Sequence, residues 1–408
     1  LLLLLFLVAL GTVLSYRTAV TGSGSSHPEL YMLYGSAAAS YTIASSDSIN
    51  STLLRLASVD EGEMELRKEV EELIDGTFFA AGDPRYRSIS AWQRINNLDD
   101  REGRRRSARA VTVRSVRLRS PKGFRAFPEF RRALRDWSRR RRRFHPGVMS
   151  EMVGLVKRPV DLHYAGLRRE DHPTSPGDAP ARRYGSCAVV GNSGILMRND
   201  HGELIDGHDL VIRLNNARIE GYHRNVGSKT GISFVNSNIL HLCARRETCF
   251  CHPYGDNVPI LMYICQPVHL LDYTACNASH KAPLLLTDPR FDLLCARIVK
   301  YYSLKRFVER TGKPPDEWDK AHDAKTFHYS SGMQAVMLAV GICDRVSLFG
   351  FGKSAEAKHH YHTNQKAELS LHDYDAEYAL YRDLTLRPQV IPFLVESGFR
   401  VPPVTVYD

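Results

Sequence analysis

Residues 187–237 read CAVVGNSGILMRNDHGELIDGHDLVIRLNNARIEGYHRNVGSKTGISFVNS. The stretch opens with a short apolar run that ends in a tight turn, Gly191 to Gly194. Small residues at a strand end let backbone amides approach a phosphate, as in the βα turns of Rossmann-like folds. A dinucleotide-binding dehydrogenase would instead show G-x-G-x-x-G and an acidic residue about 20 positions later. Because that glycine triplet is absent, the stretch predicts a nucleotide site of another kind.

A longer pattern continues from this turn. Residues 205–215 read Ile-Asp-x-His-Asp-x-Val-x-Arg-x-Asn, and Gly227, Lys229 and Thr230 follow at a fixed distance. The combination resembles the long motif of the eukaryotic sialyltransferase family, Golgi transferases that use cytidine nucleotides. The resemblance therefore predicts a sialyltransferase-like protein.

A second block, residues 328–352, reads HYSSGMQAVMLAVGICDRVSLFGFG. It is similar to the short motif of the same family, although Tyr329 replaces the usual proline. Ser330 or Ser331 can cap a helix that runs to about Ile342 and leaves amide donors free in its first turn. Such a helix end suits a ribose or a phosphate. An ordinary capped core helix would explain the serine and the apolar run equally well.

Two further motifs lie in residues 359–384, HHYHTNQKAELSLHDYDAEYALYRDL. His360 and Tyr361 resemble the start of the third family motif, and His372 with Glu377 resembles the very short motif His-x-x-x-x-Glu. All four motifs occur in the family's order, which makes a chance match improbable.

His372 is also a candidate base on its residues alone. It stands just before a predicted helix whose first turn carries the acids Asp373, Asp375 and Glu377. The positive end of that helix would oppose protonation of the imidazole, and a neutral histidine near pH 7 is a usable base. A buried or capping histidine is the structural alternative.

The resemblance implies an inverting, metal-independent transfer. His372 would take the proton from the acceptor hydroxyl, and His360 would be the second catalytic group. The residues that the resemblance assigns to the donor nucleotide sugar are Asn192, Ser193, Asn215, Ser330, Ser331, Gly332, Tyr361 and Glu377. We expect no cofactor beyond that co-substrate.

The cysteines bear on disulfide pairing and on metal binding. The resemblance implies a disulfide between Cys187 and Cys343, which would clamp the two halves of the nucleotide site. The other six cysteines cannot be paired from sequence. Cys243, Cys249, Cys251 and His252 fit no standard zinc spacing, so disulfides are favoured there. Asp373-Tyr374-Asp375 mimics a D-x-D metal site, but its acids already suit the helix start.

The donor and acceptor stay open. The third motif is similar to the plant branch of the family, and Ala217-Arg218 stands where the long motif usually has Ala-Pro. CMP-sialic acid or a related CMP-keto-sugar such as CMP-Kdo is the first expectation. UDP-galactose with a cell-wall glycan is the alternative, and a non-catalytic Golgi glycan-binding protein is a further one. A glycan acceptor is expected as partner, and no nucleic acid.

The N-terminal part of the sequence predicts a membrane anchor and a stem rather than catalytic residues. Residues 1–16 are almost entirely apolar and predict a truncated signal anchor, with a cleaved signal peptide as the alternative. Residues 17–183 predict a stem, partly disordered, with a helix near 63–75 and an arginine-rich stretch over 101–143. That stretch is read as a solvated tether in preference to an electrostatic docking site. The expected location is the Golgi membrane, as a single-pass type II protein with glycosylation at Asn50 and Asn277.

The predicted catalytic domain covers residues 184–408. The chain has 408 residues, of which 43% are hydrophobic and 25% charged, a globular composition. Short apolar runs alternate with helical stretches, which predicts an α/β, Rossmann-like doubly wound, mostly parallel sheet flanked by helices, a variant of the GT-A type. The candidate strands are 188–190, 209–214, 232–235, 260–264, 283–286 and 345–349, with a long helix at 292–310.

Overall fold

The computed structural model describes residues 49–75, 128–141, 144–166, 182–237, 254–265, 267, 282–322, 324, 327–363 and 372–407. The chain divides into two compact units, Leu1–Thr52 and Leu53–Asp408. The sheet and all the helices named below belong to the second unit.

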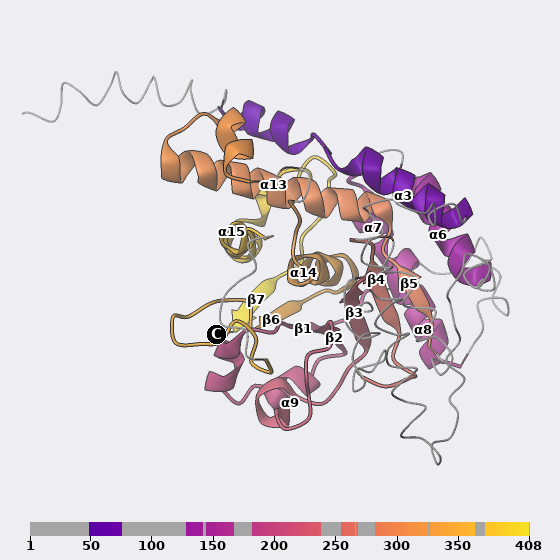
Figure 1. Ribbon diagram of the computed structural model, residues 1–408. Helices are drawn as coiled ribbons and strands as arrows, with labels where there is room; N and C mark the ends of the chain where they lie inside the picture. Colours follow the sequence, from indigo (N-terminus) through magenta and orange to yellow (C-terminus); the bar gives the residue numbers. More distant parts are fainter. Residues whose placement is uncertain are drawn as a thin grey trace, which may run out of the picture. The chain divides into compact units, whose positions relative to one another are not determined.

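Seven parallel strands form one sheet in the order β5-β4-β3-β2-β1-β6-β7 (Figure 1). Their bounds are β1 Cys187–Val190, β2 Leu210–Leu214, β3 Ile232–Asn236, β4 Ile260–Tyr263, β5 Leu284–Leu286, β6 Val346–Phe349 and β7 Val404–Tyr407. Most strands are continuous apolar runs, as expected for parallel strands covered on both faces. The predicted α/β fold class is confirmed, and only β7 was not among the candidate strands.

The strand order places a switch point between β1 and β6. From β1 the chain adds strands on one side as far as β5, and then crosses to add β6 and β7 on the other. Gly191 after β1 and Gly350 after β6 come so close that a Cβ on Gly191 would lie 2.5 Å from the carbonyl oxygen of Gly350. In open α/β sheets, ligands bind in the crevice outside the carboxyl ends of the strands at such a point.

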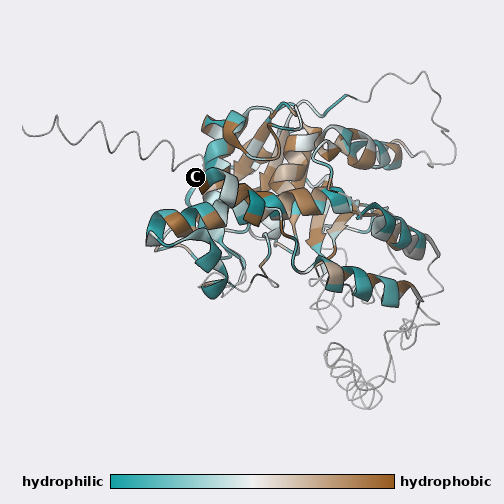
Figure 2. Cartoon of the chain, turned by 90° about the horizontal axis from the view of Figure 1, so that it is seen from above, coloured by the Kyte–Doolittle hydropathy of each residue, from teal (hydrophilic) through white to brown (hydrophobic). Residues whose placement is uncertain are grey.

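Three long helices lie on one side of the sheet (Figure 1). They are α13 Pro289–Thr311, α14 Ser331–Ile342 and α15 Tyr374–Leu386. All but one of the α14 residues are buried, and Figure 2 shows apolar colouring gathered in the interior and polar colouring on the outer helices. Helix α13 begins three residues before the predicted start, because Asp288 caps it, and ends where Gly312 adopts a left-handed conformation.

The compact unit also includes segments that precede the first strand. Helix α3 spans Glu63–Asp75, as the sequence predicted, and α6 spans Pro128–Arg140. The run α7 Val148–Met152, π-helix η2 Val153–Lys157 and α8 Arg158–Tyr164 follows, and Met149 and Met152 are buried in the main core. A domain boundary at residue 184 stays a prediction, whereas the compact unit begins at Leu53.

Several N-terminal and cysteine predictions lie outside the described residues. They concern the signal anchor at 1–16, the sequon at Asn277, and the cluster Cys243, Cys249, Cys251 and His252. Asn50 is described and exposed, so its glycosylation stays a prediction. None of the helices in the described ranges has both the length and the apolar character needed to cross a membrane.

Candidate active site

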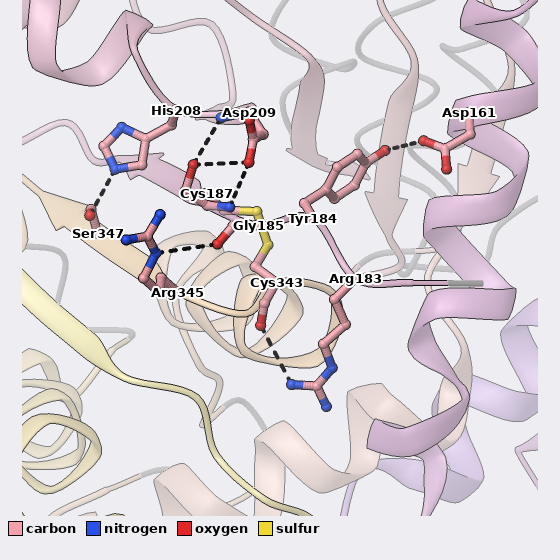
Figure 3. Close-up of a disulfide and its surroundings, with 11 residues drawn as sticks. Asp161, Arg183, Tyr184, Gly185, Cys187, His208, Asp209, Cys343, Arg345 and Ser347 are labelled. Atoms are coloured by element: carbon pink, nitrogen blue, oxygen red, sulfur yellow. Dashed lines mark hydrogen bonds between the residues drawn. A yellow bond between two sulfur atoms is a disulfide. The ribbon is translucent and has the colours of Figure 1, made fainter. Parts of the chain in front are cut away.

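A disulfide joins Cys187, the first residue of β1, to Cys343, which follows α14, as the resemblance predicted. The two Cα atoms are 6.0 Å apart. Figure 3 shows polar groups around the bond, among them the imidazole of His208 beside the hydroxyl of Ser347. Asp209 accepts from both the amide and the hydroxyl of Ser186. These groups lie at the amino ends of the strands. The bridge therefore joins the start of β1 to the end of α14, at the edge of the sheet opposite the glycine turns, and its predicted effect on the nucleotide site stays a prediction.

The carboxyl ends of three neighbouring strands meet at one hydroxyl, that of Ser331 in the first turn of α14. Asn215 after β2 donates to Ser331 Oγ at 3.4 Å, Asn236 at the end of β3 donates at 3.0 Å, and the phenol of Tyr263 in β4 lies 3.1 Å away. Asn215 has a φ of 52°, a left-handed conformation that asparagine tolerates better than most residues. This hub fixes the start of α14 against the sheet.

Ser330 caps the same helix and is itself held by Glu377 of α15. The Ser330 hydroxyl accepts from the Met333 amide at 3.1 Å and donates to Glu377 at 2.6 Å, and the Ser330 amide donates to the other carboxylate oxygen at 2.6 Å. Burial raises the pKa of Glu377 to about 7, while these hydrogen bonds oppose the shift. Glu377 was expected to bind the nucleotide. Its carboxylate instead positions the loop that would do so.

The loop after β1 is paired with the third motif. Tyr361 N donates to the carbonyl of Asn192 at 2.9 Å, and Gly194 N donates to the carbonyl of Lys358 at 2.9 Å. Ser193 caps a short 3-10 helix, Gly194–Arg198, through the Ile195 amide. Within the described residues, the buried Oδ1 of Asn192 accepts no hydrogen bond. An unused acceptor at a sheet switch point is available to a ligand.

His372 is tied to the loop that leads into α14. Its Nδ1 lies 2.8 Å from the carbonyl oxygen of His328, two residues before the helix cap. Because a carbonyl only accepts, Nδ1 carries the proton, and the neutral ring keeps a lone pair on Nε2. Burial lowers the pKa of His372 below its usual range, against the opposing effect of that hydrogen bond. The histidine that the sequence singled out is thus held in its neutral form, and its role as a base stays a prediction.

The third-motif histidines lie near His372, with an aromatic ring between them. Tyr374 is 5.5 Å from the His372 ring and 5.3 Å from the His359 ring, and His359 stacks on His360 at 4.4 Å. Burial lowers the pKa of His360 to about 4, so it is neutral at pH 7 and donates one proton at most.

Tyr361 does not present its phenol to the site. The hydroxyl donates to the carbonyl of Arg218 at 2.6 Å, and the ring is buried among apolar side chains beside Tyr222. The structure thus brings His360 toward the other site residues and gives Tyr361 a packing role.

A cavity of about 430 Å³ opens beside His372. This size is within the range of about 300–1,000 Å³ that is usual for small-molecule sites. Its wall combines hydroxyl, charged and aromatic groups from α13, the following segment and the start of α15, among them Ser303, Arg306, His322, Phe327 and Tyr374. Such a wall suits a sugar, which has both hydroxyl groups and an apolar ring face.

The Asp373 and Asp375 carboxylates are already engaged. Asp373 caps α15 and accepts from Ser303 at 2.6 Å, and Asp375 pairs with Arg306 and Lys353 at 2.8 and 2.7 Å. Nowhere in the described ranges do three or more His, Cys, Asp or Glu side chains gather as metal ligands. The D-x-D resemblance is therefore explained by capping and ion pairing.

Much of the long motif supports the fold rather than a ligand. Asp206 accepts from the amides of Ser228 and Lys229 at 2.8–2.9 Å, and the buried guanidinium of Arg213 donates to the Lys229 carbonyl and the Thr230 hydroxyl, both at 3.0 Å. These bonds close the loop between β2 and β3 and hold the strand that carries Asn215 into the site.

Sequence reasoning missed three residues of the site. Asn236 and Tyr263 complete the hub at Ser331, and His328 orients His372. The signal for Asn236 was present, because it follows an apolar run in the same way as Asn215 does.

The chain is similar to known glycosyltransferases. The sequence profile of glycosyltransferase family 29 (sialyltransferase) matches residues 156–387. The chain is 52% identical over 362 residues to a β-1,6-galactosyltransferase (GALT29A) of Arabidopsis thaliana, covering 88% of this chain and 86% of that protein. It is 50% identical over 378 residues to sialyltransferase-like protein 1 of Oryza sativa subsp. japonica, covering 88% of each. The crystal structure of a mammalian sialyltransferase aligns at 22% identity with a TM-score of 0.34, over 66% of this chain and 83% of that one.

Proposed function

This chain belongs to glycosyltransferase family 29, the sialyltransferase family, and from that premise we propose that it transfers galactose from UDP-galactose to a glycan hydroxyl. The sequence motifs alone favoured a cytidine donor. The 52% identity to a plant β-1,6-galactosyltransferase over most of both chains supports galactose as the transferred sugar, and UDP-galactose is then the donor. Cytidine donors become the second candidate, supported by the sialyltransferase character of the family.

The observation that carries the proposal is the fixed tautomer of His372. The acceptor sugar enters the 430 Å³ cavity that His372 lines, and Nε2 accepts the proton of its hydroxyl group. The hydroxyl oxygen bonds to the anomeric carbon of the donor as the bond from that carbon to the phosphate oxygen breaks. The nucleotide leaves with the bonding electrons, and the single displacement inverts the anomeric centre.

The departing nucleotide needs stabilisation of its negative charge. The first-turn amides of α14, at Ser331 and Gly332, have no intrahelical partners and lie at the positive end of the helix. A Cβ on Gly332 would come within 3.1 Å of Phe351, so only glycine leaves that turn uncrowded. A fixed array of this kind stabilises developing charge without reorganisation.

The positive charge of Arg218 would favour a diphosphate. Its carbonyl accepts from Tyr361, which holds it beside the third-motif histidines. Burial, and to a smaller extent the charge of Arg218, lowers the pKa of His362 to about 4. A cation at this place would offset the additional charge of a departing uridine diphosphate relative to a monophosphate.

The proposed location is the Golgi lumen, with anchoring by the apolar N-terminal residues. The Cys187–Cys343 disulfide supports an oxidising compartment, since such bonds are rare in the cytosol. Glycosylation at Asn50 and Asn277 is proposed on the same basis.

A donor panel tests the function directly. Purified protein is given UDP-galactose, CMP-sialic acid or CMP-Kdo with β-linked galactan oligosaccharides, and nucleotide release and product are measured. We expect UDP and a β-linked galactose from the first donor only. Release of CMP in place of UDP would reverse the donor assignment. Glycan binding with no turnover of any donor would favour the non-catalytic alternative.

A further inference from the structure

A second, smaller cavity of about 170 Å³ shares a lining residue with the cavity beside His372. Phe327 lines both cavities. A cavity of about 150 Å³ accommodates a benzene ring, so the smaller cavity has room for one six-membered ring and not for a nucleotide. Its wall includes the aromatic side chains of His328 and Tyr329, together with the apolar Ala57 and Leu66.

The polar part of this wall holds unused acceptors. Asp292 is 4% exposed, and among the described residues its Oδ2 accepts no hydrogen bond, with Arg141 Nη1 4.0 Å away. Within the same ranges Glu63 Oε1 likewise accepts none, although its other oxygen pairs with Arg141. Burial raises the pKa of Asp292 to about 6. Buried oxygens without partners are costly unless a ligand or water uses them.

The cavity wall is held in place by ion pairs. Arg297 of α13 pairs with Asp60 at 2.5 Å, and Lys300 pairs with Glu61 at 3.6 Å and donates to the Val59 carbonyl at 3.1 Å. The segment before α3 is thereby fastened to α13. A rigid wall with free acceptors is preorganised for a ligand.

The cavity adjoins the proposed base. His328 lines it, and the carbonyl of the same residue holds His372 Nδ1 at 2.8 Å, with the two rings 6.3 Å apart. His328 therefore links the smaller cavity to the proposed base.

From the cavity's size, its unused carboxylate oxygens and its place beside the base, we propose that it is a subsite for a further sugar residue of the acceptor glycan. Hydroxyl groups of that sugar donate to Asp292 and Glu63 and accept from Arg141, and its apolar face packs on Phe327. The inference rests on the proposed function, because it assumes a glycan acceptor at His372.

Part of this subsite comes from outside the family match. Ala57, Glu63 and Arg141 precede residue 156, where the match begins. Donor activation and the recognition of the acceptor chain would then depend on different parts of the sequence. Acceptor length and branching would be selected by the N-terminal helical segments.

Filling the cavity tests the subsite. Ala296→Phe places a ring into it from α13, and Ala165→Phe, at an exposed position after α8, is the matched control. KM is measured for UDP-galactose and for galactan acceptors of one, two and three sugars. For Ala296→Phe we expect the KM of the trisaccharide to rise about tenfold more than that of the monosaccharide, the scale of losing one or two hydrogen bonds to charged groups. The control should change neither value.

A second variant and a binding measurement complete the test. If Ala296→Phe lowers the melting temperature markedly, Val59→Phe, at a position 46% exposed, fills the same cavity with less strain on the core. Equal changes in KM for all acceptor lengths, or none, would overturn the subsite. If no donor supports transfer, saturation-transfer NMR of the trisaccharide with wild type and the filled variant still distinguishes the two proposals. Equal binding to both proteins would then refute the subsite independently of the donor.

Discussion

The two edges of the parallel sheet use their polar groups differently. At the amino edge, the Cys187–Cys343 disulfide is surrounded by pairs such as Asp209 with Ser186 and His208 with Ser347. At the carboxyl edge, among the described residues, the buried oxygen of Asn192 has no partner, and His372 is held neutral by burial. The first edge maintains the fold, while the second keeps groups available for a ligand.

Helix α14 contributes to both edges of the sheet. The end of α14 is fixed by the disulfide, and its start is fixed by the hub at Ser331 and by Glu377 through Ser330. Substitutions at the amino edge should therefore affect stability more than chemistry, and substitutions at the carboxyl edge the reverse.

The largest expected effect is at the amino edge. Replacing both Cys187 and Cys343 by serine opens a loop of 156 residues, which costs about 5 kcal/mol of unfolding free energy in the loop-entropy model. Urea unfolding under oxidising conditions measures this, with wild type in reducing buffer as the comparison. If the variant that folds at low temperature loses donor binding as well, the two edges are not separable.

His372→Ala should lower kcat by about 10²- to 10⁴-fold, the usual contribution of a positioned general base. Binding of UDP, measured by calorimetry, should persist because the hub and the helix cap are untouched. His223→Ala, at the exposed first position of the short helix α10 (His223–Val226), is the control. A loss of UDP binding equal to the loss of kcat would assign His372 to the donor site instead.

Glu377→Ala should affect both activity and stability, because it leaves the buried Ser330 amide unpaired. The expected cost is about 1–3 kcal/mol of unfolding free energy, with a rise in the KM for the donor as the start of α14 loosens. Glu396→Ala, an exposed glutamate, is the control and should change neither quantity. Unchanged donor KM would show that the cap does not position the nucleotide.

Asn192→Ala should raise the KM for UDP-galactose about tenfold, since it removes an acceptor that the fold itself does not use. The melting temperature should stay near that of wild type for the same reason. Asn257→Ala, an exposed asparagine, serves as the comparison. A large loss of stability with no change in KM would place Asn192 with the scaffold.

Arg218→Ala is expected to have the smallest effect, because an exposed charge contributes about 0.2–1 kcal/mol. The KM for UDP-galactose should rise a few-fold, and the inhibition constant of UDP should weaken more than that of UMP. Arg400→Ala is the control at another exposed position. Equal weakening for UDP and UMP would argue against contact with the second phosphate.

The sheet could be predicted because its strands are continuous apolar runs bounded by turns. Strand β7, Val404–Tyr407, escaped because its polar Thr405 interrupts the short run and no family motif marks it. The start of α13 was misplaced because Asp288 and Pro289 form its cap and first position, a signal readable only once the helix is located.

Only those site residues that a local sequence pattern marks could be predicted. His372 was found from its place before a helix, and Ser330 from its place as a cap. The hub was not, because Asn236 and Tyr263 reach Ser331 only through the strand order. The smaller cavity could not be predicted from the sequence either, because nothing in the arginine-rich stretch indicates that Arg141 lies beside Asp292.

The pH response of His372 bears on the central claim. Its pKa is lowered in the folded protein, so the ring stays neutral as pH falls through 6.5, and base function is lost only below that value. The acid limb of kcat/KM should therefore lie below pH 6.5. Because burial raises the pKa of Glu377 to about 7, the profile is best recorded also in Glu377→Gln, which removes that titration.

The most direct measurement is a ¹⁵N NMR titration of the histidines in the ligand-free protein, with His372 assigned by its absence in His372→Ala. At pH 7 we predict a neutral ring with the proton on Nδ1 and a free lone pair on Nε2, and a pKa below 6.5. A ring that is protonated at pH 7, or that carries its proton on Nε2, would contradict the assignment of His372 as the base.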